Sequence, residues 1–197
     1  MVVGPRNNEQ MKKLVAVLLA SFFFASANAF AAPQYVFPVT GCTVKYVKAH
    51  HDYPATDILA KKGCTVVAVT NGVVEYVALK DLWSGKTNLG EDRGGLSIAI
   101  IGDDGVRYYG SHFSKIEAGI DVGVRVVAGQ KIGEVGNTGS ARGTSPHLHF
   151  GISWPTTPTD WKIRRGKISP FLYLNAWKSG IDKSPVAEVN KAKSSQK

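Results

Sequence analysis

The sequence predicts an all-β fold, a compact antiparallel β-sandwich or barrel-like domain with a short C-terminal helix. Short apolar runs rich in β-branched residues recur from residue 35 to residue 153, and turns rich in glycine separate them. The 197 residues include 21 glycines, and the sequence has neither the heptads of a coiled coil nor the tandem repeats of a solenoid. A hydrophobic fraction of 44% with 20% charged residues excludes a wholly disordered chain.

The first 29 residues have the layout of a secretory signal peptide. Lys12 and Lys13 precede an uncharged apolar run over residues 14–25, and the small-residue pattern Ala27-Asn28-Ala29 follows. The run is shorter than the roughly 20 residues that a membrane span needs, which disfavours the alternative of a membrane anchor. We therefore expect cleavage after Ala29, with Ala31 as a second choice, and export to the periplasm or the extracellular cell wall without stable membrane insertion.

The predicted domain covers residues 35–178. A tight turn at Asn71-Gly72 and a hairpin signal at Asp103-Asp104-Gly105 separate successive strands. The polar segment 80–93 is predicted to be a loop inserted over the sheet, where it could line a cleft. The expected strands are residues 64–68, 73–79, 96–102, 106–109, 124–127, 131–135 and 147–153, and a helix is expected over residues 170–178.

Charge and cysteine usage add two expectations. Residues 179–197 are polar and rich in lysine, and we expect a basic, disordered tail there. The net charge of +9 indicates an anionic partner, although charge alone does not choose among nucleic acid, a membrane and a cell wall. In an exported protein Cys42 and Cys64 are expected to form a disulfide that braces the segment 50–57, with two buried free thiols as the alternative.

The five histidines fall in three places, at His50-His51, at His112 and at His147-Leu148-His149. Alternate side chains of a strand share a face, so His147 and His149 should point to one site while Leu148 enters the core. Two imidazoles and the Asp57 carboxylate form a donor set suited to catalytic zinc, which keeps an open position. The sequence has no G-x-S-x-G elbow and no H-E-x-x-H helix, which disfavours a serine nucleophile and a zincin.

These residues occur in ordered motifs. The segments HHDYPATDI, VRYYGSH, VAGQKIGEVGNTG and SPHLHFGI follow one another between residues 37 and 153. In this order they resemble the lysostaphin/LytM-type zinc metalloendopeptidases of bacterial cell walls. The resemblance implies a compact antiparallel β-structure with one zinc ion in a narrow groove, and hydrolysis of peptide bonds in the stem or cross-bridge of peptidoglycan.

The resemblance also assigns roles to individual residues. It implies zinc ligands at Asp57, at His149 and at one of the first two histidines, and catalytic, non-ligand roles for His112 and His147. The usual spacing H-x-x-x-D would need a histidine at Tyr53, so two extra residues must be accommodated before Asp57. His51 needs less displacement than His50 and is favoured as the first ligand.

The turn Asn137-Thr138-Gly139 is expected to shape the backbone before the H-x-H strand. Peptidoglycan is the expected partner, with anionic wall polymers bound through the basic tail and no nucleic acid. The alternative is a non-catalytic domain of the same fold that binds the wall or activates another hydrolase.

Overall fold

The computed structural model describes Met1, residues 34–48 and residues 50–196. The chain divides into two units, Met1–Ala32 and Pro33–Lys197, and the second holds every element discussed below. The signal peptide expected over residues 1–29 lies outside the described residues except for Met1. Within the described ranges, none of the helices has the length and apolar character required to cross a bilayer.

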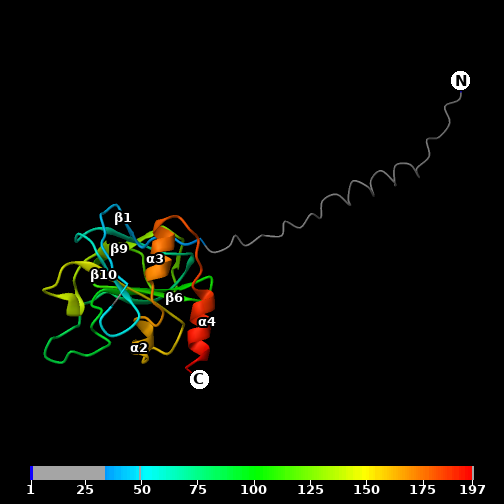
Figure 1. Cartoon of the computed structure of the whole chain (residues 1–197). Helices are drawn as coiled ribbons and strands as arrows, with labels where there is room; N and C mark the ends of the chain where they lie inside the picture. The colour runs from blue at the N-terminus through cyan, green and yellow to red at the C-terminus, as the bar shows by residue number, and fades with distance from the viewer. Residues whose placement is uncertain (2–33, 49, 197) are drawn as a thin grey trace. The chain divides into compact units, whose positions relative to one another are not determined.

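Two antiparallel sheets form the second unit, which confirms the all-β prediction (Figure 1). The first sheet has the order β1-β3-β9-β7, with β1 at Val39–Thr40, β3 at Thr65–Val67, β9 at Lys131–Val135 and β7 at Phe113–Ile116. The second has the order β2-β10-β6-β5-β4-β8, with β2 at Thr56–Leu59, β10 at His147–Ser153, β6 at Arg107–Ser111, β5 at Ser97–Gly102, β4 at Gly72–Ala78 and β8 at Arg125–Val126. In the second sheet β10 lies between β2 and β6.

The core draws apolar side chains from both sheets. Ile58, Ile98, Phe113 and Leu148 are each at most 1% exposed and belong to one hydrophobic cluster. Burying such a side chain contributes roughly 1.5–3 kcal/mol. Since Leu148 is anchored in this cluster, its neighbours in β10 on the opposite face are held at fixed positions.

Three α-helices and a 3-10 turn complete the described part of the chain. The helix α2 spans Trp161–Arg164, α3 spans Phe171–Lys178 and α4 spans Val186–Ser194, while the 3-10 turn η1 spans Gly139–Ala141. The helix expected over residues 170–178 corresponds to α3, which begins directly after Pro170, where a proline is readily accommodated. Leu174 and Trp177 of α3 are buried in the hydrophobic cluster.

The tail differs from the sequence prediction. Residues 179–197 were expected to be disordered, yet α4 forms there and buries Val189 to 3% exposure. Val186 and Ala192 pack against the same cluster, and the Tyr173 hydroxyl donates a hydrogen bond of 2.5 Å to Glu188. Apolar residues spaced by three form one narrow helix face. The lysines of α4 are exposed. They made the segment look uniformly polar, so the sequence did not reveal its apolar helix face.

The expected disulfide is present between Cys42 and Cys64, which are 22 positions apart. It links the segment that follows β1 to the residue that precedes β3. The loop that it closes contains His50 and Asp57, so the covalent link restricts the segment from which two candidate metal ligands come.

Candidate functional site

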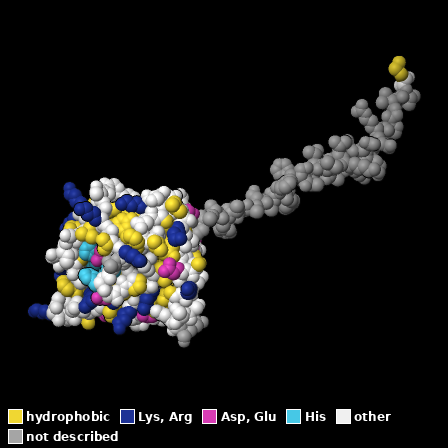
Figure 2. Space-filling view, viewed as in Figure 1, with side chains coloured by type: hydrophobic (Ala, Val, Ile, Leu, Met, Phe, Trp, Pro, Cys, Tyr) yellow, Lys and Arg dark blue, Asp and Glu magenta, His cyan; other side chains and the backbone are white. Residues whose placement is uncertain are grey.

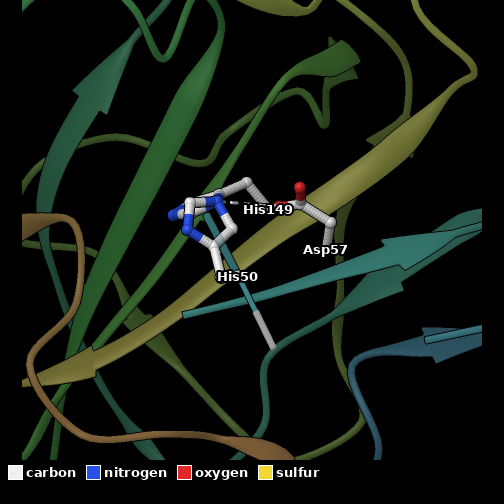
Figure 3. Close-up of side chains that lie close together, drawn as sticks. All are labelled: His50, Asp57 and His149. Atoms are coloured by element: carbon white, nitrogen blue, oxygen red, sulfur yellow. Dashed lines mark hydrogen bonds and ion pairs between the residues drawn. The ribbon is translucent and has the colours of Figure 1, made fainter. Parts of the chain in front are cut away.

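The pairing of β2 with β10 places Asp57 directly opposite His149. Cross-strand partners in an antiparallel pair have Cβ atoms about 4.5–5.5 Å apart and share a face of the sheet. The Nδ1 atom of His149 lies 2.9 Å from Oδ1 of Asp57 (Figure 3). Backbone register therefore positions these two donors.

His50 completes the cluster. Its Nε2 atom lies 3.7 Å from Oδ1 of Asp57, and its ring centroid lies 5.1 Å from that of His149. One donor atom from each of His50, Asp57 and His149 lies within 4.8 Å of the other two (Figure 3). Two imidazoles and one carboxylate form a donor set that Zn²⁺ takes in catalytic sites.

The surroundings of His149 fit a bound cation. Its Nδ1 faces the Asp57 carboxylate, while its Nε2 lies 3.2 Å from the carbonyl oxygen of Arg165. A neutral imidazole carries one N–H and can donate to only one of these acceptors. A metal ion on the Nδ1 side satisfies both, because the Nε2–H can then donate to the carbonyl, an arrangement that orients metal-ligating histidines.

His51, which the sequence favoured as the first ligand, does not join the cluster. Its side chain is exposed, and its ring stands edge-on to that of His50 with centroids 5.0 Å apart. The chain bends over residues 51–54, and the Tyr53 ring turns inward to pack 4.5 Å from the His50 ring. In the structure the half-buried Tyr53 takes up the two extra residues, so that His50 and not the expected His51 lies with Asp57 and His149.

The protonation states of the cluster suit metal binding. Burial alone would raise the pKa of Asp57, but its hydrogen bond with His149 and the imidazoles of His147 and His50 together lower it to about 2. Burial, reinforced by the neighbouring His149, lowers the pKa of His50. An ionised carboxylate and a neutral imidazole are the forms that bind a metal ion.

Two further histidines lie beside the cluster. The His112 and His147 rings have centroids 5.0 Å apart, and the His112 ring lies 6.0 Å from that of His149. Each places its Nδ1 2.8 Å from a backbone carbonyl, that of Thr138 for His112 and that of Ser145 for His147. Since a carbonyl only accepts, each Nδ1 carries a proton, which leaves Nε2 as the ring nitrogen that is free to act in the groove.

His112 is neutral and sits on a strained backbone. Burial, with the nearby His149 and His147, lowers its pKa to about 3. Its φ angle is 68°, in the left-handed region that residues other than glycine seldom adopt. Such strain is concentrated at functional positions. The turn after β6 thus presents an imidazole that is neutral near pH 7 beside the candidate metal ligands.

These residues line a groove of about 680 Å³. Gly90 and Arg93 of the segment 80–93 line the groove, as expected for a loop inserted over the sheet, and Trp161 of α2, whose ring packs against Gly90, lines it too. Figure 2 shows histidine side chains reaching the surface of one face beside acidic groups.

Asp81 ties two loops of the groove together. Its Oδ2 accepts a hydrogen bond of 2.9 Å from the Gly139 backbone N–H, and the Arg142 guanidinium approaches it to 2.7 Å. The segment 80–93 is thereby fastened to the turn whose Thr138 carbonyl orients His112. The sequence predicted a shaping role for Asn137-Thr138-Gly139 but not this attachment.

Sequence reasoning missed Tyr53 and Arg165. The Tyr53 hydroxyl lies 3.3 Å from Nε2 of His149, and the Arg165 guanidinium stacks on the Tyr53 ring. Tyr53 could have been suspected because it occupies the position where the H-x-x-x-D spacing expects a histidine. No local pattern identified Arg165, which follows a four-residue helix in a segment without predicted structure.

Comparison with known proteins gives one family. The sequence profile described as peptidase family M23 matches residues 51–161, more than half of the chain. The chain is 31% identical over 130 residues to the L-Ala–D-Glu endopeptidase of Bacillus subtilis (strain 168), covering 64% of this chain and 35% of that protein. It is 40% identical over 95 residues to the glycyl-glycine endopeptidase ALE-1 of Staphylococcus capitis, covering 48% of this chain and 22% of that protein.

Among solved structures, the antimicrobial peptidase lysostaphin from Staphylococcus simulans is similar with a TM-score of 0.55 and 25% identity. The match covers 79% of this chain and 59% of that one. The chain therefore spans about a third or less of the curated relatives that it matches and 59% of the lysostaphin structure.

Proposed function

Because the chain belongs to peptidase family M23, we propose that it is a zinc-dependent endopeptidase that hydrolyses peptide bonds in peptidoglycan. The observation that carries the proposal is the arrangement of three donors and two anchored imidazoles in one groove. The names of the two curated relatives, one for an L-Ala–D-Glu bond and one for a glycyl-glycine bond, support this class of substrate.

In this proposal His50, Asp57 and His149 hold the zinc ion. When bound, the ion acts as a Lewis acid that polarises the scissile carbonyl and lowers the pKa of water. His112 and His147 would divide the proton transfers between them, because a backbone carbonyl holds the Nδ1–H of each ring and leaves Nε2 to exchange protons. One imidazole would accept a proton from the attacking water at its Nε2, and the other, when it carries a proton at Nε2, would donate that N–H to the oxyanion that develops on the carbonyl.

Export and wall contact belong to the same proposal. The leader layout of residues 1–29 supports export to the periplasm or the extracellular wall. The net positive charge supports contact with anionic wall polymers. In the C-terminal segment this contact would involve Lys191 and Lys193, which lie on α4 and not on a free tail.

The test is digestion of purified peptidoglycan followed by mass spectrometry of the released fragments. We expect new amino termini from peptide-bond cleavage, loss of activity with a chelator and recovery with zinc. His147→Ala should retain about one zinc ion while the rate falls by about 10²- to 10⁴-fold, because it removes a proton-transfer group and no ligand.

Two results would contradict the proposal. Fragments cut only in the glycan would exclude a peptidase, and binding to the wall without release of any fragment would favour the non-catalytic alternative.

A further inference from the structure

We infer that Arg165 binds a free carboxylate of the substrate, so that the bond cleaved lies in an acidic stem peptide and not in a neutral glycine bridge. The inference rests on the proposed function and names the substrate class of the same groove. It makes Arg165 a specificity-determining residue in a segment outside the motifs that marked the site.

Arg165 lies directly beside the metal ligands. Its carbonyl oxygen is 3.2 Å from Nε2 of His149, and its side chain lines the same groove. The guanidinium carbon is 3.8 Å from the centroid of the Tyr53 ring and 4.5 Å from that of Trp161. Stacking on aromatic faces holds the planar guanidinium in one place while leaving its edges, which carry the N–H donors, free to bind.

The charge of Arg165 is uncompensated, unlike that of two neighbouring arginines. Arg164 forms a two-pronged pair with Glu75 at 2.8 and 3.3 Å, and Arg107 contacts the same carboxylate at 3.0 Å. Within the described residues the Arg165 guanidinium has no hydrogen bond or ion pair, and its Nε is buried without a partner. Because the buried Nε is out of reach, a substrate carboxylate would accept two parallel N–H bonds from the two terminal nitrogens, Nη1 and Nη2.

The carboxylates that line the groove do not neutralise Arg165. Asp52, Asp57 and Glu91 line the groove, but none forms an ion pair with Arg165. Asp57 already faces the histidines, and Glu75 is shared by Arg107 and Arg164. Since none of these carboxylates pairs with Arg165, its guanidinium is left to attract an anionic group of the substrate.

The distance to the ligands limits where the carboxylate can lie in the substrate. Tyr53 lies between His149 and the Arg165 guanidinium: its hydroxyl is 3.3 Å from Nε2 of His149, and its ring stacks on Arg165. An extended peptide advances roughly 3.3–3.6 Å per residue. The carboxylate is thus expected within about one or two residues of the scissile bond. A run of glycines offers no charge there.

The experiment compares stem peptides that differ in one group. Each carboxylate of the peptide, on the glutamyl residue, on a diamino acid or at the C-terminus, is replaced in turn by a carboxamide, and pentaglycine is the neutral reference. Two quantities are measured: kcat/KM with zinc, and the dissociation constant with the metal-free protein. The wild type should prefer the acid at one position, which identifies the carboxylate that is bound.

The variant Arg165→Gln should weaken binding and kcat/KM for that acidic peptide by about 10- to 100-fold, the size expected for a lost charge-assisted hydrogen bond. Its effect on the matching carboxamide should be less than about threefold, which also checks that the variant is folded. The affinity and kcat/KM of Arg165→Lys for the acidic peptide should lie between those of the wild type and those of Arg165→Gln. Arg125→Gln removes an exposed arginine paired with Asp103 and should behave as wild type.

The outcomes separate the two proposals. If no peptide and no peptidoglycan is cleaved, the proposed function fails. If carboxamides or pentaglycine are cleaved as well as the acidic peptides, or if Arg165→Gln affects acid and amide equally, the inference alone is overturned.

Discussion

Backbone carbonyls orient the three histidines at the centre of the groove. Thr138, Ser145 and Arg165 each present a carbonyl oxygen to one ring nitrogen, which leaves the other nitrogen directed to the site. This fixes tautomers without further ionisable side chains. Because every residue has a carbonyl, these partners leave no mark in the sequence, whereas the imidazoles themselves were recognisable.

The choice between neighbouring histidines gives the first prediction at this scale. His50→Ala should lower zinc affinity by more than about 100-fold, because it removes a ligand and not merely a supporting contact. His51→Ala should change affinity by less than about threefold, since its exposed side chain lies outside the cluster. Competition titration against a chromophoric chelator measures both, and a reversed order would restore His51 as the ligand.

The residue types at the site were predictable, but the register of the first ligand was not. Asp57, His112, His147 and His149 all lie where the motifs placed them around one groove. The position of His50 depends on how the chain absorbs two extra residues. That in turn depends on Tyr53 packing against Arg165, a contact between residues more than one hundred positions apart.

Register among β2, β10 and β6 organises the site from three separate stretches of chain. His149 pairs with Asp57 on one side and with Ser111, the neighbour of His112, on the other. The strands over residues 131–135 and 147–153 have the predicted bounds, and in the second the apolar residues Leu148, Phe150 and Ile152 alternate along the chain. The strands β2 and β7 and the helix α2 were missed, since each is four residues long and partly polar.

The attachment at Asp81 gives a prediction about loops. Asp81→Ala should remove the acceptor for Gly139 and the partner of Arg142, lowering the free energy of unfolding by about 1–2 kcal/mol. The turn that carries the Thr138 carbonyl should loosen, so kcat should fall and protease should cut the segment 80–93 faster. Denaturant titration and limited proteolysis measure these effects, with Asp81→Asn as the control that keeps an acceptor.

The same attachment should depend on pH. Burial alone would raise the pKa of Asp81, but the Gly139 N–H and Arg142 outweigh it and hold the pKa below its ordinary value of 3.8. A carboxyl group whose pKa is lowered by folding stabilises the folded state fully at pH values above its ordinary pKa. This stabilisation is lost as the pH falls through the lowered pKa. The wild type should therefore be cut as fast as Asp81→Ala in the segment 80–93 only when the pH falls below the lowered pKa of Asp81, which lies under 3.8. Equal cutting of both proteins at neutral pH would contradict the role of Asp81.

Long-range links join the two ends of the second unit. The Tyr35 N–H donates to Asp182 at 2.8 Å, and the Tyr35 ring stacks on Trp177 with centroids 5.4 Å apart. Tyr35, Trp177 and Val189 of α4 all belong to the hydrophobic cluster of the core. The sequence did not predict this closure, because its contacts are made between residues separated by some 150 positions and have no local periodicity.

The disulfide should contribute to stability across the fold. Replacing both Cys42 and Cys64 by serine should lower the free energy of unfolding by roughly 3 kcal/mol, since the unfolded chain gains the entropy of an open loop. This corresponds to a fall in Tm of roughly 6–12 °C for a domain of this size. Calorimetry measures the change, and the single variant Cys42→Ser should match the double one. An unchanged Tm would show that the link does not constrain the unfolded chain.

The left-handed backbone at His112 makes selection for stability and selection for activity favour different residues at this position. Glycine adopts φ near 68° without strain, so His112→Gly would relieve the backbone while deleting an imidazole from the groove. A population selected only to survive heating should accumulate this change, and one selected for wall turnover should purge it. Position 112 would thus record which of the two pressures a lineage has experienced.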